Sequence, residues 1–600
     1  MKMRVSDYIV QYLSELGIDK IFLVSGGGMM HLLDAITLHP KVRVVAHHHE
    51  QAATMAAEGY ARLHGKLGVS FVTSGPGAPN AVTGVIGAWL DSMPLLVVSG
   101  QAKLSQTNHY RQIEGLRQFG AYDVPSVSIM KPITKYSTLL IDPNAVRYEI
   151  EKAVYLATTG RPGPVFIDVP LDIQGALVES DDLIGFTPGE LEQEAIPLDQ
   201  LQEIVEAMQK AERPVVLAGH GIRSAHAFDD FEKLIQVLQV PVVTTQMATD
   251  LMGHEEPLFV GRCGVKGDRA GNLAIQMADF ILVLGSSLHV TTTGYEMDLF
   301  APKAIKILVD PDVGTLAKEQ VNVRMKICAS LSQFMPDLLN YMKTIKTPVR
   351  QNRSWNKRCQ VWKQEFAVAK EPHKRSDKVV NYYDLIEALS VVSNPDDVLV
   401  TDAGSAWYLM SQAYKVKKGQ RVILSGGLGT MGFAMPCATG LASAGASRVL
   451  CLTGDGSAMT ALHELAVFKA NDLNIKLIIV NNDGYASIRN TQNSYFNGRL
   501  AATGPESGLA FPKFENIAQS LNVPYQMVAN PGELDNGLIE MLRSSGPFVL
   551  EVMTDKIQEI IPTVTTVRHD DGRLESKPLD EMAPFLEQHV IDQFIFDLKK

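Results

Sequence analysis

The strongest constraint on this chain is a series of short apolar runs that each end in glycine, serine, proline or histidine. In the first third these runs are KIFLVSG, VRVVAHH, GVSFVTSGPG, MPLLVVSG and GPVFIDVP. A continuous apolar run of this length predicts a strand that is buried on both faces. Strands of this kind that alternate with helices predict a parallel sheet covered by helices on both sides.

The same alternation returns twice, which predicts an α/β protein of three doubly wound parallel-sheet domains. The second block contains RPVVLAGHG, VPVVTTQ, DFILVLGSS and IKILVDPD, and the third contains DDVLVTDAGS, RVLCLTGDGS, IKLIIVNNDG and GPFVLEVMTD. A chain of 600 residues is too long for one hydrophobic core, so several domains are expected. We place domains at 1–178, 195–345 and 379–560, a basic linker with one surface helix at 346–378, and a tail at 561–600.

Composition and charge exclude several classes of protein. With 46% hydrophobic and 20% charged residues, the chain is globular rather than disordered or fibrous. The net charge of −11 argues against nucleic acid as a general partner. The five cysteines have no CxxC spacing, so we expect reduced thiols and a cytoplasmic location. The N-terminal segment mixes charged and apolar residues at helical spacing, which predicts neither a signal peptide nor a membrane partner.

Polar residues that end two strands of the third block indicate a ligand site. Asp455 follows the predicted strand RVLCLTG and Asn482 follows IKLIIVN, an interval that fits one crossover between neighbouring parallel strands. A carboxylate and an amide oxygen at one sheet edge suit Mg²⁺ or Ca²⁺. Gly456 and Ser457 open the intervening helix, where backbone N–H groups and a hydroxyl can hold phosphate, and Gly484 lets a backbone carbonyl approach the metal. The pattern predicts Mg²⁺ that bridges a diphosphate to the protein.

The stretch GDGS, followed at this distance by NNDG, resembles the binding signature of thiamine-diphosphate-dependent enzymes. The resemblance implies thiamine diphosphate and Mg²⁺ as cofactors, with Asp455, Asn482 and Gly484 at the metal. In this family a glutamate hydrogen-bonds a pyrimidine nitrogen of the cofactor and so promotes loss of the thiazolium proton. HHHEQAATMAAEGYAR has Glu50 in the matching position, which implies that Glu50 is catalytic. By itself, a carboxylate at a helix start is equally explained by the helix dipole.

Two further segments match the family at the ring system of the cofactor. TSGPGAPN resembles the loop that would place Pro76 and Asn80 against the pyrimidine, although a plain turn has the same composition. SGGLGTMGFAMP resembles the stretch that bends the cofactor. By this resemblance Gly429 would accept a hydrogen bond from the pyrimidine amine and Met431 would separate the two rings, with a core methionine as the alternative.

A third segment, TDAGSAW, matches the family at the diphosphate. It ends a predicted strand at Gly404 and Ser405, and the equivalent turn in the family contacts the diphosphate from the side opposite Gly456 and Ser457. The family also places the glutamate of one subunit against the diphosphate site of another. The resemblance therefore implies a homodimer or homotetramer in which Glu50 completes the site of a second copy.

The domain order and the phrases GYARLHGKLGV, GAWLDSMPLLVVSGQ and GGLGTMGF resemble acetolactate synthase catalytic subunits over nearly the whole chain. This resemblance implies a carboligase that decarboxylates a small 2-keto acid, with pyruvate as the expected donor, and transfers the acyl carbanion to a carbonyl acceptor. Related decarboxylases carry an acid and a histidine pair where this chain has Gly27 and a single His109, which favours carbon–carbon bond formation. A 2-keto acid decarboxylase, another thiamine-diphosphate-dependent lyase and an idle regulatory relative remain as alternatives.

Departures from the synthases leave three features open. Ala121, Tyr122 and Asp123 stand where the synthases have Phe-Gln-Glu, so the acceptor is undefined. GRCG around Cys263 resembles the flavin-facing turn of the central domain, but Ser287 replaces an arginine of the flavin segment, so FAD is an open question. The segment KPLDEMAPFLEQHV is compatible with a lid over the pocket and with a surface tail.

Overall fold

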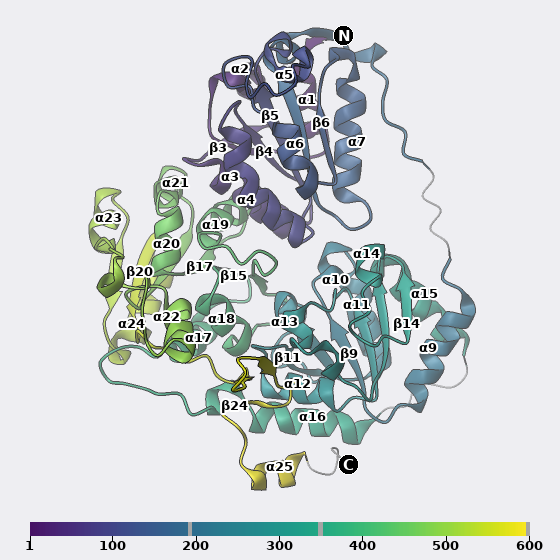
Figure 1. The fold of residues 1–600 in the computed structure, drawn as a ribbon, viewed down its shortest axis with the longest axis vertical. Coiled ribbons are helices and arrows are strands. Elements are labelled where there is room, and N and C mark those ends of the chain that lie inside the picture. Colours follow the sequence, from purple (N-terminus) through teal and green to yellow (C-terminus); the bar gives the residue numbers. More distant parts are fainter. Residues whose placement is uncertain (190–194, 346–351, 596–600) are drawn as a thin grey trace.

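Each of the three predicted blocks forms a six-stranded parallel sheet with helices on both faces (Figure 1). The computed structural model describes residues 1–189, 195–345 and 352–595. The strand orders are β3-β2-β4-β5-β7-β6, β11-β10-β9-β12-β13-β14 and β16-β15-β17-β18-β20-β19. Within these described ranges, no helix combines the length and the apolar character needed to cross a membrane.

The first domain lies at the top of Figure 1 and carries the sequence from its N-terminus to β8 (Leu177–Glu179), which pairs with β1 (Lys2–Arg4). Its sheet consists of β2 (Lys20–Leu23), β3 (Arg43–Ala46), β4 (Gly68–Val72), β5 (Leu95–Gln101), β6 (Tyr136–Leu139) and β7 (Pro164–Pro170). One face is covered by α1 (Val5–Glu15), α2 (Met30–Leu38), α7 (Val146–Thr158) and α8 (Leu171–Gly175). The other is covered by α3 (Glu50–His64), α4 (Gly77–Leu90) and α6 (Ser126–Met130).

The second, central domain has the same construction. Its sheet consists of β9 (Pro214–Ala218), β10 (Val242–Thr245), β11 (Phe259–Cys263), β12 (Phe280–Leu284), β13 (Ile305–Asp310) and β14 (Met325–Cys328). One face packs on α9 (Leu198–Lys210), α11 (Phe228–Leu238) and α15 (Leu331–Thr344). The other packs on α12 (Arg269–Gln276) and α16 (Arg353–Glu365).

The third domain carries the predicted metal motif. Its sheet consists of β15 (Val398–Thr401), β16 (Arg421–Ile423), β17 (Val449–Gly454), β18 (Ile475–Asn481), β19 (Tyr525–Val528) and β20 (Phe548–Met553). One face packs on α17 (Tyr382–Val392), α18 (Ser405–Ala413) and α24 (Leu534–Arg543). The other packs on α19 (Ala434–Ser443), α20 (Asp455–Ala461), α21 (Glu464–Ala470) and α23 (Phe514–Ser520), and α22 (Ala486–Tyr495) follows β18.

The structure corrects one predicted helix. The sequence pattern predicts a single helix after the GDGS motif, but the chain forms α20 and α21 with Leu462 and His463 between them. Leu465 and Phe468 of α21 are buried, whereas Leu462 is only partly buried. The break turns the buried Glu464 carboxylate toward His47 of the first domain, with 3.0 Å between Oε1 and the ring Nδ1. A helical apolar stripe alone does not reveal this contact between domains.

Two segments outside the sheets are more deeply packed than the sequence suggests. The predicted linker does contain one helix, α16, but its Trp355, Cys359 and Trp362 are buried in the core of the central domain. The C-terminal segment forms short strands, β21 (Thr563–Val564) to β24 (Met582–Ala583), and α25 (Gln588–Phe594). Leu579 and Met582 join the same core, so the described part of this segment is neither a lid nor a loose surface tail.

A tight seam joins the first and third domains through α3 and α19. A Cβ atom on Gly440 would lie 1.9 Å from the Ala56 carbonyl oxygen, so the two helix backbones touch. Beside them, the buried Arg62 guanidinium donates to Glu58 Oε1 and to Asp91 Oδ2. Asp91 Oδ1 in turn accepts the backbone N–H of Gly427, at 2.8 Å, from the third domain. This buried ion cluster holds the two domains in register.

We expect Arg62→Met to destabilise the protein strongly. The substitution leaves the buried Glu58 and Asp91 carboxylates without their cation, a change that typically costs about 3–5 kcal/mol. Urea denaturation followed by circular dichroism measures the loss. The control is Lys233→Met, because the Lys233 side chain is 64% exposed in its ion pair with Asp230 and should contribute less than about 1 kcal/mol. A loss no larger than that of the control would contradict the assignment.

Candidate active site

The candidate site is built on β17 and β18, which are neighbouring parallel strands as the spacing predicts. β17 ends at Gly454, and Asp455 is the first residue of α20. Asp455 Oδ2 accepts the backbone N–H groups of Asn482 and Gly484, at 3.1 Å and 2.9 Å, and Oδ1 accepts that of Gly456 at 2.7 Å. The structure therefore brings four predicted residues together at the carboxyl edge of the sheet.

This cluster fits a divalent cation by its chemistry. The Asn482 Oδ1 atom is buried and has no hydrogen-bond partner among the described residues. Burial raises the pKa of Asp455 to about 6, although backbone N–H groups of the motif, first among them that of Gly484, oppose the shift. A bound cation would satisfy the amide oxygen and offset the cost of a buried carboxylate. Within the described residues, no group of three or more His, Cys, Asp or Glu side chains could hold a metal, so amide and carbonyl oxygens would have to complete this site.

Two glycines of the motif have no room for a side chain. Gly484 has a φ of +144°, and a Cβ atom there would lie 1.9 Å from the Thr503 carbonyl oxygen. A Cβ atom on Gly456 would lie 2.2 Å from the ring of Tyr485. Both positions therefore require glycine, because a side chain would collide with the tightly packed turn of the motif. Ser457 follows Gly456 in the first turn of α20 and is buried.

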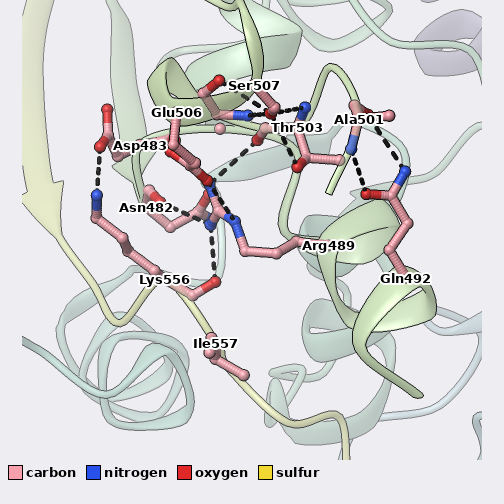
Figure 2. Close-up of polar contacts among 12 residues, drawn as sticks. Asn482, Asp483, Arg489, Gln492, Ala501, Thr503, Glu506, Ser507, Lys556 and Ile557 are labelled. Atoms are coloured by element: carbon pink, nitrogen blue, oxygen red, sulfur yellow. Dashed lines mark hydrogen bonds and ion pairs between the residues drawn. The ribbon is translucent and has the colours of Figure 1, made fainter. Parts of the chain in front are cut away.

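A buried arginine that the sequence did not identify holds the turn after β18. Arg489 of α22 is 2% exposed and donates to the carbonyl oxygens of Asn482, Asp483 and Thr503, at 3.1 Å, 2.8 Å and 3.1 Å. It also donates to the Lys556 carbonyl, at 2.8 Å, while the Lys556 ammonium pairs with Asp483 (Figure 2). The guanidinium therefore connects the turn after β18 to two distant segments of the chain, at Thr503 and Lys556. A lone arginine within a helix offers no sequence signal for this role.

A second unrecognised residue, Asp402, lies directly after β15. Its Oδ1 accepts the backbone N–H of Phe433 at 2.8 Å, and its Oδ2 accepts the Thr453 hydroxyl at 2.7 Å. Burial raises the pKa of Asp402 to about 6. The carboxylate thus joins the end of β15 to the loop before α19 and to the end of β17. Its place at a strand end in TDAGSAW is the signal that could have identified it.

The predicted diphosphate turn follows Asp402. Gly404 has a φ of +71° and precedes Ser405, the first residue of α18. The Ser405 hydroxyl lies 3.1 Å from the hydroxyl of Ser487 in α22. This contact places the start of α18 beside α22, the helix that follows the turn after β18.

The predicted catalytic glutamate belongs to a separate group in the first domain. Glu50 is the first residue of α3 and is 6% exposed. Asn80 Nδ2 donates to Glu50 Oε2 at 2.9 Å, so two predicted residues are joined. Pro76 precedes the first turn of α4, the helix that carries Asn80.

A cavity of about 330 Å³ separates part of the first domain from the loop before α19. Met431 and His463 line it from the third domain, and His49 lines it from the start of α3. Met431 is 38% exposed, which excludes the core-methionine interpretation. Gly429 has a φ of +65° and no atom within 4 Å of a Cβ placed there, so its backbone also faces open space.

The predicted residues therefore form two groups within one chain. One contains Glu50 and Asn80, and the other contains Asp455, Gly456, Asn482 and Gly484. Across the described residues, no hydrogen bond or ion pair links the two groups.

Comparisons with known proteins assign the domains that carry these groups. Family models described as the N-terminal TPP binding domain, the central domain and the C-terminal TPP binding domain of thiamine pyrophosphate enzymes match residues 3–120, 201–338 and 402–552. The acetolactate synthase large subunit of Lactococcus lactis is 31% identical over 96% of this chain and 97% of its own. The acetolactate synthase isozyme 1 large subunit of Escherichia coli is 30% identical over 93% and 95%. A probable acetolactate synthase large subunit of Methanocaldococcus jannaschii is 30% identical over 94% and 93%.

These matches agree with the geometry of the site. Glu50 lies in the N-terminal match, and Asp455 and Asn482 lie in the C-terminal match. Similarity to acetolactate synthase large subunits covers nearly the full length of both proteins. The chain therefore belongs to the thiamine-diphosphate-dependent enzymes and is an enzyme of the acetolactate synthase type.

Proposed function

We propose that this enzyme is a Mg²⁺-dependent carboligase that decarboxylates a 2-keto acid, with pyruvate as donor, and joins the acyl group to a second carbonyl compound. The observation that carries the proposal is that the Asp455 carboxylate and the Asn482 Oδ1 atom, which has no hydrogen-bond partner in the described part of the chain, lie at one sheet edge. The names of the similar proteins, acetolactate synthases, support acyl transfer as the reaction type.

The third domain would hold the cofactor through its diphosphate. Asp455, Asn482 Oδ1 and the Gly484 carbonyl would hold Mg²⁺. The backbone N–H groups and hydroxyl at Gly456 and Ser457 would bind phosphate oxygens at the start of α20. Bound thiamine diphosphate supplies an acidic carbon that adds to a keto acid and accepts the electron pair released with carbon dioxide.

The first domain would control the proton at the cofactor. Asn80 orients the Glu50 carboxyl group through Oε2, and Oε1 has no hydrogen-bond partner among the described residues. Oε1 is therefore available to share a proton with a ring nitrogen of the pyrimidine. Burial of Glu50 keeps this proton from exchanging freely with water. Gly429 and Met431 would orient the rings from the third domain.

The loop at Gly27 supports ligation over simple decarboxylation. This loop lies beside Thr73, since the Gly28 backbone N–H donates to the Thr73 hydroxyl at 3.2 Å. Gly27 is exposed, and a Cβ atom there would meet nothing within 4 Å, so the loop brings no acid into the space. His109 of α5 (Asn108–Arg111) is also exposed. Without a proton donor at the reacting carbon, attack on a second carbonyl competes better with aldehyde release.

This chain differs from the synthases at an acceptor position and at a flavin position. Tyr122 occupies the place of the synthases' glutamine, is 66% exposed and contacts Gly75, so we propose an acceptor other than the one the synthases take. The central domain has glycine turns at the ends of its strands, but Ser287 stands where the flavin segment has arginine. We therefore leave FAD out of the proposal, and a flavin absorption band in the purified protein would correct it.

We further propose that Glu50 of one copy acts at the Asp455 site of another copy. The two groups belong to different domains, and no hydrogen bond or ion pair of the described chain connects them. A two-fold dimer would create two equivalent composite sites. The full arrangement would be a homodimer or a pair of such dimers.

A product assay tests the proposed reaction. We expect the protein with thiamine diphosphate, Mg²⁺ and pyruvate to release carbon dioxide and to form ketols when aldehydes or ketones are added, because no acid at Gly27 protonates the reacting carbon. Mass spectrometry of the products measures the ratio of ketol to aldehyde. Acetaldehyde as the main product would favour the decarboxylase alternative, and no carbon dioxide from any small 2-keto acid would favour an idle relative.

Co-expression of two inactive variants tests the composite site. We expect Glu50→Gln to bind the cofactor but turn over poorly, and Asp455→Ala to bind Mg²⁺ and cofactor weakly. Random pairing would restore one intact site in each mixed dimer, hence about a quarter of wild-type activity. Activity of the purified mixture measures this recovery, and each variant alone is the control. No recovery, despite mixed dimers on tandem-tag purification, would place Glu50 and Asp455 of one chain in the same site.

Arg489→Met tests the support of the metal turn. The variant loses four hydrogen bonds to backbone carbonyls, so the turn that carries Asn482 and Gly484 should become less ordered. We expect Mg²⁺-dependent binding of thiamine diphosphate to weaken at least about tenfold in isothermal titration calorimetry. The control is Gln492→Met on the same helix as Arg489. It removes exposed hydrogen bonds between Gln492 and Ala501, and this variant should bind thiamine diphosphate normally. Equal affinity of both variants would refute the role of Arg489.

A further inference from the structure

A second cavity, remote from Glu50 and Asp455, lies between the central and third domains. It has a volume of about 70 Å³ and is bounded by the edge strand β11, the end of α16, α17 and the end of α18. A water molecule needs roughly 10–15 Å³ of this kind of space, so the cavity accommodates a ligand of about five or six non-hydrogen atoms.

The cavity has a buried arginine that forms no ion pair with any carboxylate of the described residues. Arg262 of β11 is 2% exposed, and its Nε atom is buried with no hydrogen-bond partner among the described residues. Among the described residues, the guanidinium makes one hydrogen bond, from Nη2 to the Tyr414 carbonyl oxygen at 3.2 Å. Burial lowers the pKa of Arg262 to about 10, and the group is still charged at neutral pH. A buried, incompletely paired guanidinium is costly unless an anion satisfies it.

The acid beside it, Asp268, makes no hydrogen bond to the guanidinium among the described residues and instead accepts two backbone N–H groups. Oδ2 accepts the backbone N–H of Arg262 and Oδ1 accepts that of Gly271, each at 2.7 Å. These bonds make Asp268 the N-cap of α12. The carboxylate therefore balances part of the local charge without contacting the guanidinium.

Two further groups on the wall can donate hydrogen bonds. Lys363 of α16 donates to the carbonyl oxygens of His254 and Phe259, and its ammonium retains a third hydrogen. The Nδ1 atom of His254 is buried and has no partner among the described residues. The other cations are paired, since Lys415 contacts Glu387 at 2.7 Å and Arg375 contacts Asp384 at 2.9 Å. Arg262 and Lys363 against Asp268 leave the cavity with one net positive charge.

The remaining wall is apolar. Phe366, Val368 and Ala270 line the cavity together with Ala413 at the end of α18. A phosphate dianion would lose its hydration against these side chains, and it has no apolar part that could pack against them. A monoanion with a short hydrocarbon chain fits both the single positive charge and the apolar wall.

We propose that this cavity binds a small monocarboxylate, with its carboxylate on Arg262 and its hydrocarbon part against Phe366 and Val368. This inference does not depend on the proposed function. α18 begins at Ser405, beside the candidate active site, and the cavity lies at its other end, at Ala413. The ligand would therefore occupy a position separate from the candidate active site.

Thermal unfolding of the protein, saturated with thiamine diphosphate and Mg²⁺ at constant ionic strength, tests this site. The probe is isobutyrate, which has no keto group, and the comparison compounds are neutral isobutyramide and inorganic phosphate. We expect isobutyrate alone to raise Tm in a saturable manner. We expect Arg262→Met to weaken the apparent affinity for isobutyrate at least about tenfold, because a charge-assisted hydrogen bond is lost.

The control variant is Arg324→Met, which removes an arginine of the same domain whose side chain is 70% exposed, and it should respond like wild type. Ala413→Leu provides a second test that keeps every charge but fills the cavity, and it should also abolish the response. Equal shifts in wild type and Arg262→Met, or no shift in wild type, would overturn the proposal. So would an equal response to isobutyramide, or an Arg262-dependent response to phosphate alone.

Discussion

The site depends on one interaction, the acceptance of three backbone N–H groups by the buried Asp455 carboxylate. These bonds connect the start of α20 to the turn after β18, so a single side chain sets the spacing between two strand ends. The cost of burying the carboxylate is visible in its raised pKa. A cation beside Asn482 Oδ1 would offset that cost.

Buried carboxylates have the same role elsewhere around the site. Asp402 accepts N–H groups from the loop before α19, and Asp91 of the first domain accepts one from Gly427 in the same loop region. Arg489 acts in the opposite sense, since its guanidinium donates to carbonyl oxygens of the turn after β18. Loops that would otherwise be mobile are thereby held by side chains from neighbouring strands and helices. The segments held in this way carry Gly429, Met431 and Gly484.

The sequence predicted the centre of each sheet better than its edges. β4, β5 and β7 are buried along their whole length and read as continuous apolar runs. The edge strands β6, β14 and β19 are partly exposed, so their apolar pattern is interrupted and the sequence did not reveal them. β11 is fully buried, but Gly261 and Arg262 break its apolar run. The Arg262 side chain is polar because it faces a cavity between domains, which no local pattern encodes.

Among the site residues too, some could be predicted from the sequence and others could not. Asp455 and Asn482 could be predicted because a crossover of fixed length must return them to one sheet edge. Arg489 could not, because its partners Thr503 and Lys556 come from segments that meet only in the fold. The sequence motifs also say nothing about where Glu50 lies relative to Asp455, since the two residues belong to different domains. Contacts within a supersecondary unit follow from spacing, whereas contacts between units, and between copies of the chain, depend on surfaces that the spacing does not specify.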